Sequence, residues 1–381
     1  MADVMTPKER IEAVIGLEQP DRVPVAPMPI YFNAHVNGIS SKEFLRNMVR
    51  QVEVTERTFE RMGGWDAWYF APGGTNWKTL KIRFPLQILT PGDGLPDDAP
   101  LPQLDEKEVM AVGDYDVVIN DGYDAWYAAY LRRLYPDENL DVIFTQYAPA
   151  ASKALAAFHR KWEVERKVPL LYGVSIFQPV EIFSFARSFY QFALDLARRP
   201  EKVTQACDAA LEPVLQRAIN GCKNMGLTAL WVGGWRTGAT FISPRQFERF
   251  VLPGLKKIVN ELVANDLTPV LHFDANWTPF LRFLRELPPK KCILATDQET
   301  DLFEAKKVLG DHMCLLGNVH PHTLALGTVD DVVAECRRLI DIVGAGGGFI
   351  LSSGCEVPFN ARPENVQAMV DTAKTYGVYQ K

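Results

Sequence analysis

The sequence predicts an α/β protein built as a (β/α)8 TIM-type barrel. Short apolar segments alternate with amphipathic segments along most of the 381 residues, and counting them gives about eight strands. No glycine-rich fingerprint follows the first strand, where a doubly wound dinucleotide-binding sheet would carry one. We therefore expect one domain over residues 1–381, with an inserted excursion after the second strand.

The composition limits the classes of partner. Hydrophobic residues make up 47% of the chain and charged residues 23%, which is typical of a soluble protein with a sizeable core. The net charge of −6 gives no electrostatic reason to expect nucleic acid or an anionic membrane as a partner. No signal-like or bilayer-spanning apolar run is found. Six cysteines are too sparse for a disulfide framework, and we expect a cytoplasmic protein.

The first part of the chain predicts two helices and two strands. Thr6, as N-cap with Glu9 three residues later, predicts a helix that begins with a capping box. A strand is expected over 21–29, a helix over 42–62 from its apolar spacing, and a second strand over 66–71. These elements form the first two units of the barrel.

The next segment is predicted to leave the barrel and the remainder to return to it. Residues 73–115 are rich in Pro, Gly and Asp, and residues 116–165 look mostly helical with irregular breaks. From residue 168 onward the alternation is regular. Strands are predicted at 168–177, 227–232, 269–271, 292–296, 314–317 and 349–351, and helices at 182–198, 200–225, from 243, at 278–286, from 328 and at 363–376.

Polar residues collect where these strands end. In a parallel barrel the carboxyl ends of the strands form the active-site face. No lysine is found at these positions, which argues against Schiff-base chemistry. The residues are Tyr31, Asn33, Gln178, Glu181, Trp235, Arg236, His272, Asp274, Asp297, Asn318, His320 and Cys355.

Three of these residues form a candidate metal site. His272 and Asp274 point to the same side of an extended chain, because side chains alternate with a period of two. Cys355 is the one cysteine that follows a strand end. Zinc accepts imidazole, carboxylate and thiolate ligands, and a catalytic site leaves one position open, so we predict that these three hold zinc. In the alternative, His272 and Asp274 only hydrogen-bond and Cys355 only packs.

The other strand-end residues are candidates for substrate binding and proton transfer. Asp297 and His320 are the candidate catalytic groups, because either could handle a proton. Arg236 could pair with a substrate carboxylate or form a structural ion pair. Aromatic rings near the mouth would suit a planar or bulky ligand. The substrate-binding candidates are Tyr31, Asn33, Gln178, Trp235, Arg236 and Asn318.

Segments along nearly the whole chain carry a family resemblance: Lys8-Glu-Arg-Ile, Pro20-Asp-Arg-Val-Pro, Ile242-Ser-Pro, Phe247–Pro253, the stretch around His272, Gly346–Cys355 and Pro363–Met369. They resemble the uroporphyrinogen decarboxylase superfamily, specifically its cobalamin-dependent methyltransferase branch. The resemblance implies a (β/α) barrel, which is the fold of that superfamily.

The resemblance implies a zinc site with one departure from the pattern. In that branch zinc is held by a His-x-Cys pair and by a further cysteine after the last strand, which correspond to His272 and Cys355, but Asp274 stands in place of the middle cysteine. A carboxylate leaves zinc a harder Lewis acid than a thiolate does, which suits an oxygen substrate. The implied activity is methyl transfer between a small molecule and a corrinoid. The small molecule is a methylated substrate, for which we expect an O-methyl compound, or a methyl acceptor. The corrinoid is free cobalamin or a corrinoid protein.

Two other functions are alternatives to this one. The first is a metal-free decarboxylase or lyase like the uroporphyrinogen decarboxylases, whose arginine-rich N-terminal stretch has no counterpart in Val23–Tyr31. The second is a corrinoid-binding scaffold without activity. A scaffold has no use for so many polar groups at strand ends, so we expect an enzyme.

Overall fold

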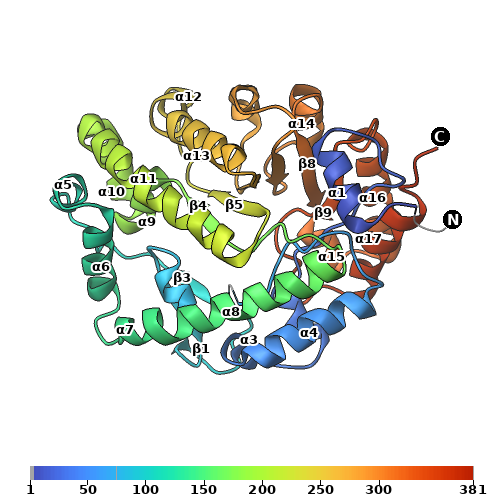
Figure 1. Cartoon of the computed structure of the whole chain (residues 1–381), viewed down its shortest axis with the longest axis horizontal. Helices are drawn as coiled ribbons and strands as arrows, with labels where there is room; N and C mark the ends of the chain where they lie inside the picture. The colour runs from blue at the N-terminus through green and yellow to red at the C-terminus, as the bar shows by residue number, and fades with distance from the viewer. Residues whose placement is uncertain (1–3, 74, 381) are drawn as a thin grey trace.

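The computed structural model describes residues 4–73 and 75–380 and shows a central parallel sheet surrounded by helices (Figure 1). Within these residues the sheet has six regular strands in chain order, each parallel to its neighbours. They are β4 (Ser175–Phe177), β5 (Ala229–Gly234), β6 (Thr268–Phe273), β7 (Ile293–Thr296), β8 (Cys314–Val319) and β9 (Phe349–Ser353).

Two extended segments near the N-terminus close this sheet into a ring. Val25 forms a parallel bridge with Leu351 of β9, and the Asp66 N–H donates to the Val25 carbonyl at 2.8 Å. Trp68 in turn forms a parallel bridge with Leu170, which lies just before β4. The predicted (β/α)8 TIM-type architecture is confirmed, and the carboxyl ends of all its strands face one mouth.

The first two predicted strands are extended segments and not regular strands. Pro24, Pro27 and Pro29 lack an N–H and cannot continue a hydrogen-bonded ladder, so 21–29 pairs only at isolated bridges. The predicted strand at 168–177 is interrupted by bends at Gly173 and Val174, and only its last three residues form β4. These breaks leave irregular backbone in one wall of the barrel.

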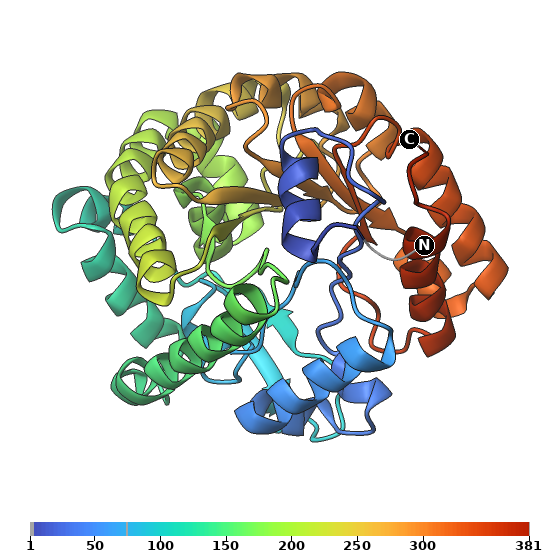
Figure 2. The ribbon, with the colours of Figure 1, turned by 45° about the vertical axis from the view of Figure 1, so that its right-hand side comes forward.

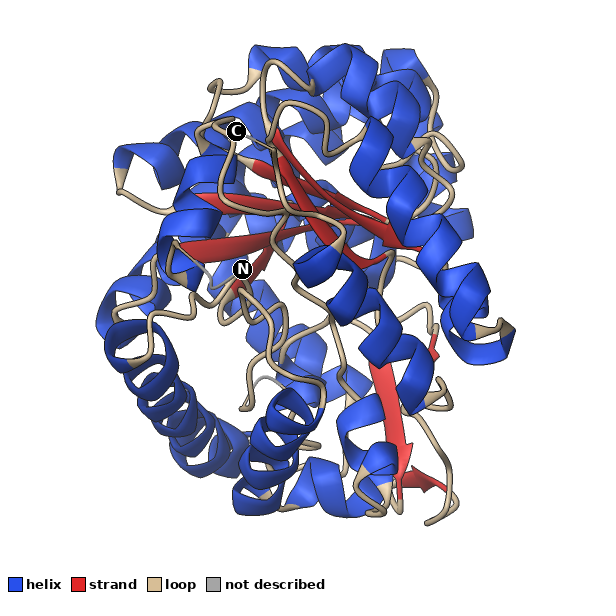
Figure 3. Cartoon of the chain, turned by 90° about the vertical axis from the view of Figure 1, so that its right-hand side faces the viewer, coloured by secondary structure: helices blue, strands red, loops and turns tan. Residues whose placement is uncertain are grey.

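The helices that follow the strands cover the outside of the barrel (Figure 3). The predicted helix at 182–198 is divided at Ser188, whose φ is 61°. The predicted helix at 278–286 is a 3-10 helix. The outer elements are α9 (Pro179–Ala186), α10 (Phe189–Arg198), α11 (Pro200–Met225), α12 (Pro244–Gln246), η4 (Phe247–Val251), α13 (Leu252–Ala264), η5 (Thr278–Glu286), α14 (Leu302–Leu309), α15 (Pro321–Leu326), α16 (Val329–Ile342) and α17 (Pro363–Thr375).

The N-terminal elements and the excursion lie around the remaining wall. The capping box predicted at Thr6 and Glu9 is present and begins α1 (Pro7–Ile15). The predicted helix at 42–62 is divided at Asn47, which caps the second half. These elements are α2 (Phe32–Val36), α3 (Ser41–Arg46), α4 (Met48–Arg61), η1 (Thr79–Ile82), α5 (Asp114–Asn120), α6 (Tyr123–Leu134), α7 (Leu140–Val142), η2 (Ile143–Tyr147), α8 (Ala148–His159) and η3 (Arg160–Glu165).

The excursion carries a small sheet of its own, drawn apart from the central strands in Figure 3. Its order is β2 (Gly94–Leu95), β1 (Gln87–Pro91), β3 (Gln103–Asp105). The two chain ends meet at the bridge between Arg22 and Val378, and Figure 2 shows both termini on the same side of the molecule. Among the helices of the described residues, none has the length and apolar character needed to cross a membrane.

The buried apolar residues form two clusters. The larger one fills the layer between the strands and the helices, and the smaller one includes the interior of the barrel. In the smaller cluster aromatic residues such as Tyr69, Tyr172 and Trp231 gather beneath the mouth. This interior cluster forms the floor and wall of the site described next.

Candidate functional site

The structure brings His272, Asp274 and Cys355 together at the barrel mouth. His272 lies near the end of β6, Asp274 follows β6 directly, and Cys355 follows β9. His272 Nε2 is 3.3 Å from Asp274 Oδ1 and 3.9 Å from Cys355 Sγ. The three ligand atoms lie within 4.8 Å of one another. Because the parallel strands of the barrel all end at the same mouth, residues 83 positions apart in the chain meet here.

This donor set fits a zinc ion. Tetrahedral zinc, with nitrogen or oxygen at about 2.0 Å and sulfur at about 2.3 Å, separates its nitrogen and oxygen ligands by roughly 3.3 Å and its nitrogen and sulfur ligands by roughly 3.6 Å. The distances from His272 Nε2 to Asp274 and Cys355 are 3.3 and 3.9 Å. Small side-chain movements would bring all three atoms into such a tetrahedron, with one corner left for another ligand.

Two aromatic residues fix the His272 ring, and neither was found from the sequence. The Tyr69 hydroxyl lies 2.5 Å from His272 Nδ1. The Trp231 ring stacks on the imidazole with centroids 5.0 Å apart and an interplanar angle of 29°. Both lie inside apolar stretches that looked like core. A tyrosine hydroxyl within a buried segment, which needs a polar partner, was the signal available.

The Asp274 loop is held by a network that includes Asp297. Ala275 has a left-handed φ of 68°, and its N–H donates to Asp297 Oδ2 at 2.7 Å. Trp277 Nε1–H donates to the Asp274 carbonyl at 2.9 Å. The Asn318 amide donates to the Asp297 carbonyl at 3.0 Å. Asp297 thus lies next to the metal-site candidate, where burial raises the pKa of its carboxyl and the charge of Asp274 raises it further.

Cys355 and Glu356 link the candidate site to Tyr31. Burial raises the pKa of the Cys355 thiol well above its usual value, and the neighbouring Asp274 carboxylate adds to the effect. A metal ion would reverse this, because a coordinating thiol loses its proton. Glu356 Oε1 accepts the Tyr31 N–H at 2.9 Å, and burial raises the pKa of Glu356 to about 7.

A cation from the excursion also lies near this interior cluster. Arg83 donates to Ser175 Oγ at 3.2 Å from Nε and 3.0 Å from Nη2, and it also donates to the Tyr172 hydroxyl. The Tyr172 ring lies 5.2 Å from the Trp231 ring, centroid to centroid. The strand-end inventory missed Arg83, because this residue reaches the barrel from the excursion and not from a strand.

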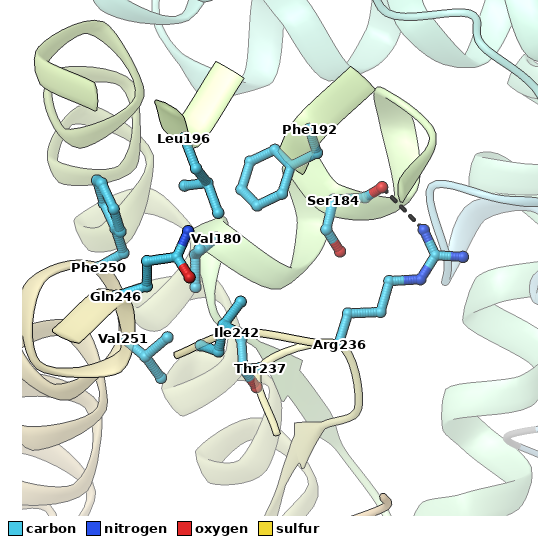
Figure 4. Close-up of a pocket in the computed structure, with 10 residues that line it drawn as sticks. All are labelled: Val180, Ser184, Phe192, Leu196, Arg236, Thr237, Ile242, Gln246, Phe250 and Val251. Carbon is cyan, nitrogen blue, oxygen red and sulfur yellow. Dashed lines mark hydrogen bonds between the residues drawn. The ribbon is translucent and has the colours of Figure 1, made fainter. Parts of the chain in front are cut away.

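Arg236 and Trp235 occupy a different part of the mouth. Arg236 Nη1 pairs with Glu106 Oε1 at 2.9 Å and donates to the Ser184 carbonyl at 2.9 Å, as Figure 4 shows for Ser184. The cavity beside it has a volume of about 10 Å³, too small for a substrate. Trp235 packs on Phe185, with centroids 5.6 Å apart. Of the two alternatives for Arg236, the structure therefore shows the structural ion pair.

Asn33 and His320 make structural contacts, whereas the amide nitrogen of the Gln178 side chain is buried without a hydrogen-bond partner among the described residues. The Asn33 amide lies 3.4 Å from Thr55 Oγ1 of α4, and the buried Gln178 lies at the start of α9. His320 is exposed, and its Nδ1 accepts the His322 N–H at 3.0 Å, which caps α15. Among the described contacts, none joins these three side chains to the His272 group. The structure shows His320 as the cap of α15, and its expected part in proton transfer stays a prediction.

Comparisons with known proteins agree with the observed fold and identify the family. A model of the uroporphyrinogen decarboxylase (URO-D) family matches residues 132–376. Uroporphyrinogen decarboxylase of Syntrophotalea carbinolica is 26% identical over 49% of this chain and 50% of its own. Methylcobamide:CoM methyltransferase MtaA of Methanosarcina barkeri is 25% identical over 62% of this chain and 66% of its own. A solved methyltransferase from Methanosarcina mazei superposes with a TM-score of 0.72 at 21% identity, covering 98% of this chain and 99% of that one.

The curated relatives are matched over part of their length. The chain spans about a third to two thirds of the relatives it matches, from 37% for a decarboxylase of Geobacter metallireducens to 66% for MtaA. The matches include proteins of both activities, decarboxylases and methyltransferases.

Proposed function

Since the chain belongs to the uroporphyrinogen decarboxylase family, we propose that it is a zinc-dependent methyltransferase linked to a corrinoid. The observation that carries the proposal is the meeting of His272, Asp274 and Cys355 ligand atoms within 4.8 Å. Relatives named methylcobamide:CoM methyltransferases support corrinoid-linked methyl transfer. We propose a small O-methyl compound as the substrate and a corrinoid, free or carried by a partner protein, on the other side of the transfer.

The chain's own residues would bind the metal ion and supply a proton to the substrate. His272, Asp274 and Cys355 would hold zinc, which when bound supplies a Lewis acid for the substrate oxygen. With a neutral imidazole, a carboxylate and a thiolate, the ligands balance the charge of the ion, while the single sulfur keeps it harder than a site with two. Asp297, close to Asp274 and with a raised pKa, is the candidate donor of a proton to the departing oxygen.

The aromatic wall beside His272 favours a planar methyl ether. Trp231 is flanked by Tyr172, with centroids 5.2 Å apart, and by Phe177 at 5.5 Å. Phe84 extends the wall, 5.4 Å from Phe177. Flat rings of this kind bind an aromatic ring by edge and face contacts, and they hold its methyl group in a fixed place for transfer. We therefore propose a methyl aryl ether as the substrate.

Elemental analysis and a substrate screen test the proposal. We expect purified protein to hold one zinc ion per chain, and His272→Ala and Cys355→Ala to lose it. In a screen of methylated phenols, thiols and amines with cob(I)alamin, methyl phenyl ethers should give methylcobalamin. Variants that keep their full zinc content would refute the metal site. Metal-free protein that decarboxylates uroporphyrinogen would favour the other activity found among the relatives.

A further inference from the structure

Tyr69 contacts the candidate metal site from beneath it. It lies in the extended segment that follows Asp66, and its side chain is 1% exposed. Its hydroxyl oxygen is 2.5 Å from His272 Nδ1, the ring nitrogen that faces away from Asp274 and Cys355. A hydrogen bond between two buried groups holds that edge of the ring in position.

A second constraint on the His272 ring comes from Trp231. The indole stacks on the imidazole face, with centroids 5.0 Å apart. The ring is therefore held at one edge by Tyr69 and across one face by Trp231. In this orientation Nε2 points to Asp274 Oδ1 at 3.3 Å and to Cys355 Sγ at 3.9 Å. A ring flip would put Cδ2 in the place of Nδ1 and Cε1 in the place of Nε2, and it would lose the bond to Tyr69.

The tautomer of the imidazole decides which of its nitrogens can bind a metal. A neutral imidazole carries its proton on one nitrogen and a lone pair on the other, and the hydrogen bond made by one nitrogen decides which binds a metal. The Tyr69 hydroxyl oxygen can accept one hydrogen bond while keeping its own proton.

We propose that Tyr69 is a positioning residue: its phenol oxygen accepts the Nδ1–H of His272 and so fixes Nε2 as the metal-binding atom. This inference rests on the proposed metal site. It names a residue outside the three ligands and ties the second strand segment to them. Partners of this kind typically change metal affinity by about 10-fold to 100-fold when they are removed.

Tyr172 provides a matched control. It is a buried tyrosine of the same cluster and also packs on Trp231, with centroids 5.2 Å apart, but its hydroxyl bonds Arg83 and not His272. Tyr69→Phe and Tyr172→Phe each delete one hydroxyl oxygen from the same buried cluster. A general loss of packing would affect both variants alike.

The first measurement is zinc affinity by competition with a chromogenic chelator. We expect Tyr69→Phe to bind zinc about 10-fold to 100-fold more weakly than the unmodified chain, and Tyr172→Phe to bind as the unmodified chain does. Thermal denaturation establishes that both variants are folded. Wild-type affinity in Tyr69→Phe, or equal losses in both variants, would overturn the positioning role.

The second measurement does not need the metal. Nitrogen-15 spectra of the metal-free protein, at a pH where imidazole is neutral, report which nitrogen carries the proton, and His272→Gln assigns the signal among the six histidines. We expect the proton on Nδ1 in the unmodified chain and a mixture of tautomers in Tyr69→Phe. A proton on Nε2 in the unmodified chain would overturn the inference even if zinc binds. The expected tautomer in a chain that takes up no zinc would instead refute the proposed metal site and leave standing only the control of the His272 tautomer by Tyr69.

Discussion

At the scale of single residues, Asp274 is the residue that distinguishes this candidate metal site from the His-x-Cys pattern of the resembling methyltransferases. It lies 3.3 Å from His272 Nε2 and is partly open to solvent, with 34% of its side chain exposed. A carboxylate here, where the resemblance leads one to expect a thiolate, changes the softness of the ligand set and leaves its charge unchanged. The identity of this one ligand is therefore the basis for expecting an oxygen substrate.

Asp274→Cys should shift the preference toward thiols. We expect the variant to keep zinc, to demethylate methyl aryl ethers more slowly and to accept methyl groups on thiols faster, with a change in the ratio of about tenfold or more, equivalent to roughly 1.4 kcal/mol in relative barrier height. Rates with cob(I)alamin and with methylcobalamin measure both directions. Asp274→Ala is the control and should lose zinc. An unchanged ratio in Asp274→Cys would show that this ligand does not set specificity.

Glu181 should make stability depend on pH. Its Oε1 accepts the N–H groups of Trp235 and Arg236, at 2.8 and 2.6 Å, and burial raises its pKa from 4.5 to about 7. Because the folded chain binds more protons than the unfolded chain between these values, stability falls as pH rises from about 4.5 to 7.

Glu181→Gln removes this titration and keeps an oxygen for the two N–H groups. The measurement is urea unfolding at pH 5 and at pH 8. The unmodified chain should lose free energy of unfolding between pH 5 and pH 8, and the variant should lose less, by about 1–3 kcal/mol. Equal losses in the variant and the unmodified chain would contradict the prediction.

At the scale of elements, the first two barrel segments depend on a buried charge network. Their prolines and short pairings give few ladder hydrogen bonds, and Asp66 supplies others. Its carboxylate accepts from Arg10 Nη1 at 2.6 Å, Arg22 Nη1 at 2.7 Å and the Val25 N–H at 2.9 Å. One carboxylate thereby joins α1 to both extended segments, and the segment that carries Tyr69 begins here.

Asp66→Asn should destabilise the fold strongly, because it leaves two buried guanidinium groups without their shared counter-charge. We expect the free energy of unfolding to fall by about 3–5 kcal/mol, measured by chemical denaturation. Asp97→Asn, which removes a carboxylate from a surface pair with Lys42, is the control and should change stability little. Similar effects of the two substitutions would show that the buried network is not a principal support.

At the scale of the whole molecule, the excursion is part of the site's wall. Arg83, which follows η1, reaches across to Ser175 of β4 and to Tyr172 before it. The bends at Gly173 and Val174 interrupt the barrel at this point, and Ile82 and Arg83 of the excursion line a cavity together with these two residues. The inserted segment and the barrel therefore hold each other in place beside the aromatic wall.

Arg83→Gln should loosen that contact. Loss of the charge-assisted hydrogen bonds should lower stability by about 1–3 kcal/mol and speed amide hydrogen exchange in η1 and β4. Zinc affinity should stay unchanged, because Arg83 contacts none of the three ligands through the hydrogen bonds that the structure describes. Unaltered exchange in both elements would show that the excursion is anchored elsewhere.

The sequence by itself determined the barrel, its excursion and the three residues of the candidate metal site. Strand and helix periods are local, and the carboxyl ends of parallel strands meet wherever a barrel closes, so His272 and Cys355 could be placed at one mouth from their positions after strands. The capping box at Thr6 and Glu9 was equally local. The prolines at 24, 27 and 29, although visible in the sequence, were not recognised as barriers to a regular strand.

Only the tertiary structure decided which strand-end residues converge and what supports them. Arg236 and His320 satisfy the same rule as His272, yet one pairs with Glu106 and the other caps a helix. Tyr69, Trp231 and Arg83 reach the site from a buried segment and from the excursion. Side-chain direction and contacts between distant segments depend on how the layers pack, and no local period records them.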